Sequence, residues 1–128
     1  MNIRHSVPAT LLAYLLLQGT AFAASATKKE LVDTPYPAGY HTHIVETRIP
    51  ANAQAPLHSH PGIESGYILS GGGMLHIEGQ SAREMKPGST ALVPPNTRHW
   101  FKNGPQETVI VSTYVLEDGK EAMQLVKP

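Results

Sequence analysis

Three histidines and one glutamate stand at spacings that suit a metal site. His58 and His60 are separated by a single residue, which on a β-strand places both imidazoles on the same face. Glu64 follows the turn-forming pair Pro61-Gly62, so its carboxylate can reach back toward the two rings. His99 comes later, just beyond a second proline-rich turn. Three imidazoles and a carboxylate form a mixed nitrogen and oxygen ligand set that suits Mn, Fe, Co, Ni, Cu or Zn.

The elements that must position these side chains are short strands. Glycine and proline recur as turn residues between short apolar runs, which is typical of an all-β sandwich or barrel. The predicted strands cover residues 40–49, 65–70, 74–78, 89–93, 97–101 and 107–116. Residues 108–116 are nearly all β-branched, apolar or aromatic, which predicts a central strand buried on both faces.

The segments before and after these strands show no clear strand or helix pattern. Residues 27–39 are polar and contain proline, so we expect an N-terminal arm or linker that can pair with a partner subunit. The folded domain is then expected over residues 40–118, followed by a C-terminal tail over 119–128. No amphipathic helix of useful length is visible, and only residues 119–126 have a sequence compatible with a short one.

The first 26 residues have the layout of a secretory signal peptide. Arg4 and His5 precede an apolar stretch over residues 9–17, and two small-x-small tripeptides end at Ala23 and Ala26. We expect cleavage after one of these two alanines. The alternative, a transmembrane anchor, needs a run of roughly 20 apolar residues, and this one is shorter. The sequence therefore predicts an exported protein, periplasmic or secreted, with no stable membrane anchor.

Composition excludes several classes of protein. A chain of 128 residues is the size of one domain, and the absence of cysteine rules out disulfides, thiolate zinc sites and a thiol nucleophile. Lys and Arg balance Asp and Glu at 10 each, which argues against a nucleic-acid-binding protein because such proteins need a basic surplus. A small exported domain without disulfides must be stabilised by packing, by oligomerisation or by a metal ion.

Two stretches of the chain resemble the paired motifs of the cupin superfamily. The first is the run from His58 to Glu64 with Gly71 beyond it, and the second consists of Gly88, Pro94, His99 and Asn103. Asn52 and Asn96 stand where those motifs have glycine. Both are turn positions, and asparagine tolerates a positive φ better than other residues with a side chain.

The resemblance is to small, single-domain, quercetinase-like cupins. It implies a double-stranded β-helix, or jelly-roll, barrel that holds one divalent transition metal ion (Fe, Mn, Ni, Cu, Zn or Co). The implied ligands are His58, His60, Glu64 and His99, with Glu64 also a possible general base. Cupins of this kind commonly pair as homodimers.

Three functions are compatible with such a site. The first is a metal-dependent dioxygenase that acts on a small chelating enol, diol or acid. The second is a non-catalytic periplasmic module that binds a small ligand or the metal ion itself. The third is a structural protein that the metal stabilises.

The alternation of side chains along a strand predicts which way several other side chains face. Ile68 and Phe101 share faces with Glu64 and His99, so we expect them to wall the pocket. Tyr67 either donates a proton near the metal or packs in its strand. His41 and His43 form a second His-x-His pair, which is a pocket contact, an ordinary strand pair or a fortuitous metal site. His76 and Trp100 are expected to face outward.

Overall fold

The computed structural model describes residues 25–127, which form ten β-strands and no helix. The expected signal peptide lies, up to residue 24, outside the described residues. Within residues 25–127 no segment forms an apolar helix of the length that a bilayer requires. The predicted all-β architecture is confirmed.

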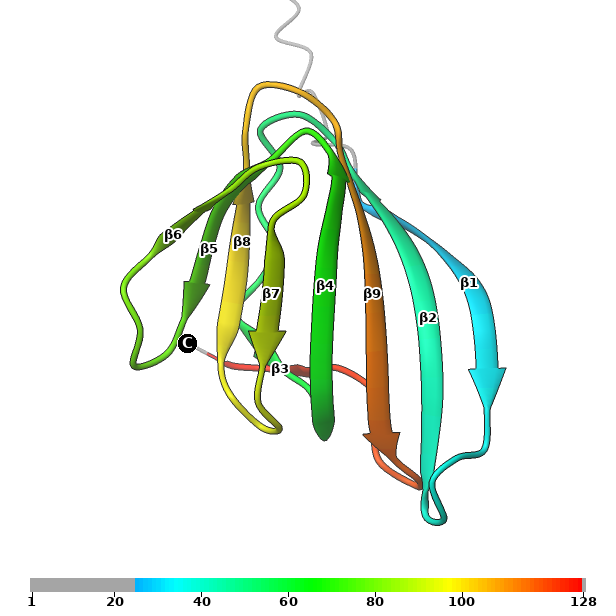
Figure 1. The fold of residues 1–128 in the computed structure, drawn as a ribbon. Helices are drawn as coiled ribbons and strands as arrows, with labels where there is room; N and C mark the ends of the chain where they lie inside the picture. The colour runs from blue at the N-terminus through cyan, green and yellow to red at the C-terminus, as the bar shows by residue number, and fades with distance from the viewer. Residues whose placement is uncertain (1–24, 128) are drawn as a thin grey trace, which may run out of the picture.

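The strands form two antiparallel five-stranded sheets that face each other (Figure 1). The large sheet has the order β1 (Thr27–Thr34), β2 (Tyr40–Ile49), β9 (Thr108–Glu117), β4 (Gly62–Ser70) and β7 (Thr90–Val93). The small sheet has the order β10 (Gln124–Leu125), β3 (His58–Ser59), β8 (His99–Asn103), β5 (Gly73–Ile77) and β6 (Arg83–Met85). In Figure 1, β1 and β2 lie on one side of the molecule, and β5, β6 and β8 lie on the other.

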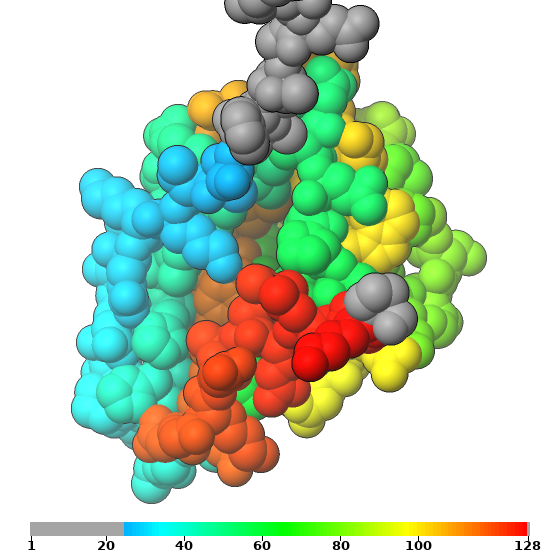
Figure 2. Space-filling model, turned by 180° about the vertical axis from the view of Figure 1, so that it is seen from behind, coloured from blue at the N-terminus to red at the C-terminus, as the bar shows by residue number. Residues whose placement is uncertain are grey.

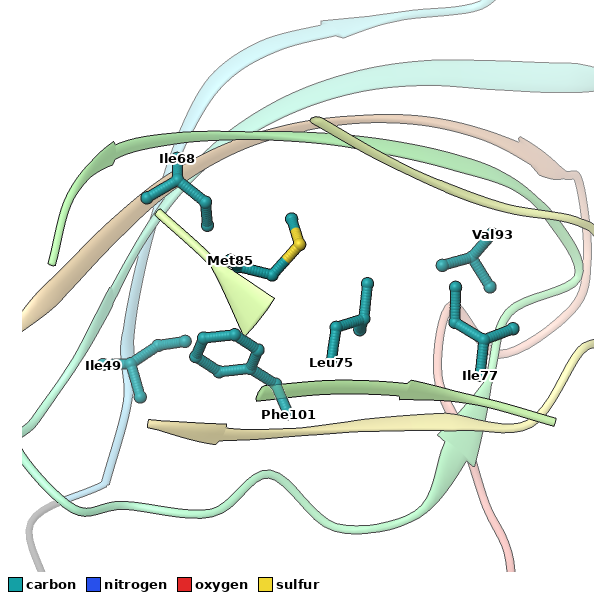
Figure 3. Packing of buried hydrophobic residues seen from close by; sticks show 7 residues of the cluster. All are labelled: Ile49, Ile68, Leu75, Ile77, Met85, Val93 and Phe101. Atoms are coloured by element: carbon teal, nitrogen blue, oxygen red, sulfur yellow. The ribbon is translucent and has the colours of Figure 1, made fainter. Parts of the chain in front are cut away.

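The hydrophobic core fills the space between the two sheets. Phe101 and Leu75 are direct cross-strand partners in the small sheet, and Figure 3 shows both lying across from Ile68 of the large sheet. The cluster consists of Ile49, Ile68, Leu75, Ile77, Met85, Val93 and Phe101, all of them buried. These alternate side chains hold the sheets together through apolar burial, the main favourable term in folding.

Six of the strands match the predicted ones to within a few residues, and four were not predicted. The predicted arm is a strand of the large sheet: β1 pairs with β2 from Thr27 opposite Arg48 to Thr34 opposite Thr42. The arm therefore pairs with a strand of its own chain, and the expected pairing with a partner subunit is not what the structure shows. The tail forms no helix. Instead Gln124 and Leu125 add β10 to the edge of β3, so the helical alternative for residues 119–126 is wrong.

Strand β9 is central, as predicted, because β2 and β4 flank it. Its inner face is closed: Thr108 and Ser112 are almost completely buried. Its outer face is not, since Val111 and Val115 are only half-buried. The prediction of burial on both faces is wrong for residues 25–127, because within them no second layer covers the outside of the large sheet.

The turn residues adopt the backbone conformations expected of them. Asn52 has φ 61° and Asn96 has φ 57°, so asparagine holds the left-handed conformation at both positions where the cupin motifs have glycine. Gly88 has φ 87°, a backbone conformation that residues with a side chain rarely adopt. The turn at Asn96 leads into β8, the strand that carries His99.

Candidate metal centre

The four predicted ligands come together at the ends of three strands. His58 on β3 pairs directly with His99 on β8, and their ring centroids lie 4.2 Å apart. His60 follows β3, and its ring centroid is 4.9 Å from that of His58. The ligating nitrogens of the three imidazoles all lie within 4.8 Å of one another. Oε2 of Glu64, on β4, is 3.2 Å from Nε2 of His99 and 3.3 Å from Nε2 of His60.

Backbone carbonyls fix the tautomer of each ring. In all three histidines Nδ1 faces a carbonyl oxygen, which can only accept a hydrogen bond. Nδ1 must therefore carry the proton and donate it, which leaves the lone pair on Nε2. The acceptors for His58, His60 and His99 are the carbonyls of Pro56, Ala122 and Thr97, at 2.7, 2.6 and 2.9 Å. This is the hydrogen-bonding pattern that orients histidine ligands toward a metal ion.

The inner atoms of this cluster need a cation between them. Nε2 of His60 is buried and has no hydrogen-bond partner among the described residues. Oε2 of Glu64 lies 3.3 Å away, and with the His60 proton on Nδ1 these two acceptors face each other without a proton. Such a buried, unsatisfied lone pair costs free energy. A metal ion bound by the three Nε2 atoms and the carboxylate would satisfy all of them, so the residues fit a divalent cation.

The pKa values of His58, Glu64 and His99 are shifted by burial and by their contacts within the cluster. Burial lowers the pKa of His58 to about 4, so this ring is neutral at pH 7. Burial raises the pKa of Glu64, but the close contacts of its carboxylate with the His60 and His99 rings outweigh burial and hold that pKa below the usual range. Burial also lowers the pKa of His99, and the contact with Glu64 more than compensates, so that pKa is raised. The Glu64 carboxylate therefore favours positive charge at the centre of the cluster.

Two residues of the site come from β9 and were not predicted. Oγ of Ser112 donates a hydrogen bond of 3.1 Å to Oε1 of Glu64. Tyr114 is the cross-strand partner of Glu64, and its ring lies edge-on to His60 at 5.0 Å. Burial first, and then the charge of Glu64, raise the pKa of Tyr114 above its ordinary value, so the phenol stays protonated. The available signal was that Ser112 and Tyr114 stand at alternate positions of one strand and therefore share a face.

The other tyrosine considered as a proton donor lies elsewhere. Tyr67 lies on the opposite face of β4 from Glu64, and the residue is 46% exposed. It does not line the cavity beside the cluster. Tyr67 is therefore not placed to donate a proton at the cluster, and the phenol at the site belongs to Tyr114.

A cavity of about 530 Å³ between the two sheets ends at the cluster. Its polar wall includes His58, Glu64, His99, Ser112 and Tyr114. Most of the remaining wall is apolar and includes Ile68 and Phe101, which confirms the pocket positions predicted for these two side chains. Figure 2 shows this face hollowed between blue β1, the green segment that leads into β3 and the red C-terminal segment.

His41, His43 and His76 lie outside this cavity. His76 stacks on Trp100 with ring centroids 3.7 Å apart and planes 3° apart, and neither residue lines the cavity. Both therefore take the outward positions predicted for them. His41 and His43 do not line the cavity either, so the pocket alternative for this second His-x-His pair is wrong.

Known proteins similar to this chain share its fold and part of its sequence. A family model described as a cupin domain matches residues 45–116, more than half of the chain. An acireductone dioxygenase from Bacillus cereus is 29% identical over 107 residues, which cover 71% of this chain and 61% of that protein. A second acireductone dioxygenase, from Bacillus mycoides, is 34% identical over 67 residues, which cover 48% of this chain and 39% of that protein. The crystal structure of a cupin-like protein from Thermotoga maritima is 25% identical, with a TM-score of 0.64, and the match covers 79% of this chain and 75% of that one. The chain thus spans about two fifths to three fifths of the length of the two curated relatives.

Proposed function

Because this chain belongs to the cupin domain family, we propose that it is a metal-dependent dioxygenase that acts on a small chelating enol, diol or acid. The ligands of one divalent transition metal ion (Fe, Mn, Ni, Cu, Zn or Co) are His58, His60, Glu64 and His99. One observation carries the proposal. Three imidazoles held through Nδ1 by backbone carbonyls, together with a carboxylate, converge at the wall of a largely apolar cavity.

The residues around the cavity have distinct tasks in this proposal. A bound transition metal ion supplies Lewis acidity and a template that brings a chelating substrate and dioxygen together. Glu64 is ionised, and because Ser112 occupies its Oε1, the other oxygen is left to ligate or to take a proton from the substrate. Tyr114 offers a protonated phenol beside His60. The apolar wall formed by Ile68, Phe101 and their neighbours excludes water from the reacting groups.

The similar proteins support oxygen chemistry as the first choice. Both curated relatives are named acireductone dioxygenases, so acireductone is the first substrate to test. The cavity also admits other chelating molecules, because its wall is apolar and only one end carries the ligands. A substrate screen should therefore include other enols, diols and hydroxy acids.

We also propose that the domain works after export and as a homodimer. The composition of residues 1–26 supports export, and N-terminal sequencing of protein from the periplasm or the medium tests it through the cleavage position. The half-buried apolar side chains on the outer face of β9 support pairing between two copies. Light scattering coupled to size exclusion tests the dimer, and a monomer at micromolar concentration would contradict it.

Metal analysis followed by an oxygen-electrode screen tests the enzymatic proposal. Protein recovered from its native compartment should contain one equivalent of transition metal and consume oxygen as a chelating substrate disappears. The His99→Ala variant should lose the metal and the oxygen uptake but keep its β-sheet circular dichroism. The matched control is His76→Ala, which removes an imidazole outside the cavity and should change neither.

Two results would contradict different parts of the proposal. Full metal content in His99→Ala would refute the ligand assignment. Stoichiometric metal without oxygen uptake for any chelating substrate would refute the dioxygenase, and tight binding of such a compound without turnover would establish a binding module instead.

A further inference from the structure

A second cluster of metal-ligating side chains lies on the inner face of the large sheet, at its β1–β2 edge. It contains His41 and His43 from β2, and Glu30 and Asp33 from β1. Asp118, just after β9, lies beside His41. None of these five residues lines the cavity that contains the first cluster. The proposed function above does not use them.

A β-bulge brings the two carboxylates of β1 onto one face. Glu30 and Asp33 are three residues apart, so a regular strand would point them to opposite sides. The register with β2 shifts between Glu30 and Val32, and as a result Glu30 pairs with Val45 while Asp33 pairs with His43. Val45 and His43 are two residues apart and share a face. The extra residue in β1 therefore aims both carboxylates at the histidine pair.

The ligand atoms are close enough to share one ion. Oδ1 of Asp33 lies 2.7 Å from Nδ1 of His41 and 3.7 Å from Nδ1 of His43. Oε1 of Glu30 lies 2.7 Å from Nδ1 of His43. The ligand atoms of Asp33, His41 and His43 all lie within 4.8 Å of one another, as in the first cluster. The two imidazoles stack with their planes 24° apart, so both present an edge to the same carboxylate.

No lysine or arginine among the described residues balances the negative charge of this cluster. Glu30, Asp33 and Asp118 contribute three negative charges around two imidazoles. Within residues 25–127, neither lysine nor arginine lies within 4.0 Å of these carboxylates. The histidines are partly shielded, with side-chain exposures of 39% for His41 and 24% for His43. A bound divalent ion would neutralise most of this charge where water screens it only in part.

We propose that Glu30, Asp33, His41 and His43 form a second metal site, which binds a divalent transition ion of the Zn²⁺ class. Two imidazole nitrogens and two carboxylate oxygens match the ligands and the coordination number that Zn²⁺ prefers. Oδ1 of Asp118 lies 3.6 Å from the other ring nitrogen of His41, so a further negative charge faces the far edge of that ring. Mg²⁺ suits the site poorly, because it prefers an octahedron of oxygen ligands and gives up water reluctantly.

The site has a structural consequence for the cavity. Its ligands come from two neighbouring strands, so a bound ion fastens the edge strand β1 to β2. Lys28, also on β1, lines the cavity. The bound ion therefore stabilises the strand that forms one side of the cavity mouth, and β1 should open less readily in the loaded protein.

Calorimetric titration with Zn²⁺ tests the proposal in a protein whose first cluster is disabled. The His58→Ala/His99→Ala variant should still bind one equivalent of Zn²⁺, with a rise in melting temperature, and should show no such response to Mg²⁺. Adding His41→Ala and His43→Ala to that background should abolish the remaining equivalent. Adding His76→Ala instead should leave it unchanged, because that imidazole belongs to neither cluster.

The outcomes separate this proposal from the first one. Failure of the disabled variant to bind Zn²⁺ overturns the second site, and so does binding that survives loss of His41 and His43. If the wild-type protein binds one equivalent that only the His41 and His43 changes remove, the second site stands and the cavity ligands are wrong. Asp33→Asn, which keeps the shape of the side chain and removes its charge, should weaken Zn²⁺ binding while β1 stays folded. Unchanged affinity in that variant also contradicts the site.

Discussion

The hydrogen bond from Ser112 to Glu64 should control how well the cavity cluster holds a metal ion. Ser112 is 2% exposed, and its hydroxyl is within 3.1 Å of Oε1 of Glu64. Ser112→Ala removes this donor and nothing larger than one oxygen atom. The carboxylate then keeps its two histidine contacts through Oε2 but loses the contact that fixes its rotation. Glu64 becomes a less well-oriented ligand.

Two independent magnitudes give the size of the effect. A hydrogen bond to a charged group contributes about 1.5–3 kcal/mol. Loss of a partner that orients a metal ligand typically costs about 10- to 100-fold in metal affinity, which is about 1.4–2.7 kcal/mol. The two ranges agree, so Ser112→Ala should weaken metal binding by about 10- to 100-fold. The ligand set itself is unchanged, so binding should weaken without being lost.

Competition with a chelator of known affinity measures this effect in the purified protein. Ser65→Ala is the matched control, because Ser65 neighbours Glu64 in the chain but is exposed on the outer face of β4. It should leave the affinity unchanged. Metal affinity within twofold of wild type in Ser112→Ala, or an equal loss in both variants, would refute the role of this hydrogen bond.

Three further predictions concern the scaffold and the protonation of the site. Gly62→Ala should lower the free energy of unfolding by about 3 kcal/mol, because the new Cβ would lie 1.8 Å from the carbonyl oxygen of Val115. Gly66→Ala should change it by less than about 1 kcal/mol, because the atom nearest to its new Cβ, Oγ of Ser112, is 3.4 Å away. Urea denaturation measures both, and equal effects would contradict the clash. Asn103→Ala should cost about 3 kcal/mol or more in the same assay, since the buried amide donates to three backbone carbonyls; a loss below about 1 kcal/mol would contradict this reasoning. In metal-free protein the ring of His58 should titrate near pH 4 by NMR, so the stability linked to it is present above pH 6.5 and is lost as the pH falls toward 4; titration near pH 6.5 would contradict its burial.

The convergence of His58, His60 and Glu64 was accessible from sequence because local rules place these three side chains. A single intervening residue sets the common face of His58 and His60, and the geometry of a turn brings Glu64 back. The asparagines at positions 52 and 96 were recognisable for a similar reason, since a left-handed turn residue is a property of two or three neighbouring positions. Local backbone geometry therefore accounts for most of the successful predictions.

Features that depend on pairing between distant strands were not accessible. Tyr67 and Tyr114 look alike in sequence, and only the register of β4 against β9 shows that Tyr114 faces Glu64 while Tyr67 faces outward. The bulge between Glu30 and Val32 leaves no distinct mark in a polar segment, so the face of Asp33 could not be derived. Strands as short as β3 and β10, of two residues each, show no periodicity at all.

The segment after β9 affects where this protein can be truncated, because the carbonyl of Ala122 accepts the hydrogen bond from Nδ1 of His60. The family match stops at residue 116, and a fragment cut there would keep all four cavity ligands. It would lose the acceptor that holds Nδ1 of His60 and the strand that pairs with β3. Such a fragment would contain every residue of the recognised domain and still present a freely rotating His60. The unit that builds the centre is longer than the unit that sequence similarity delimits, so expression tags and truncations belong outside residues 27–127.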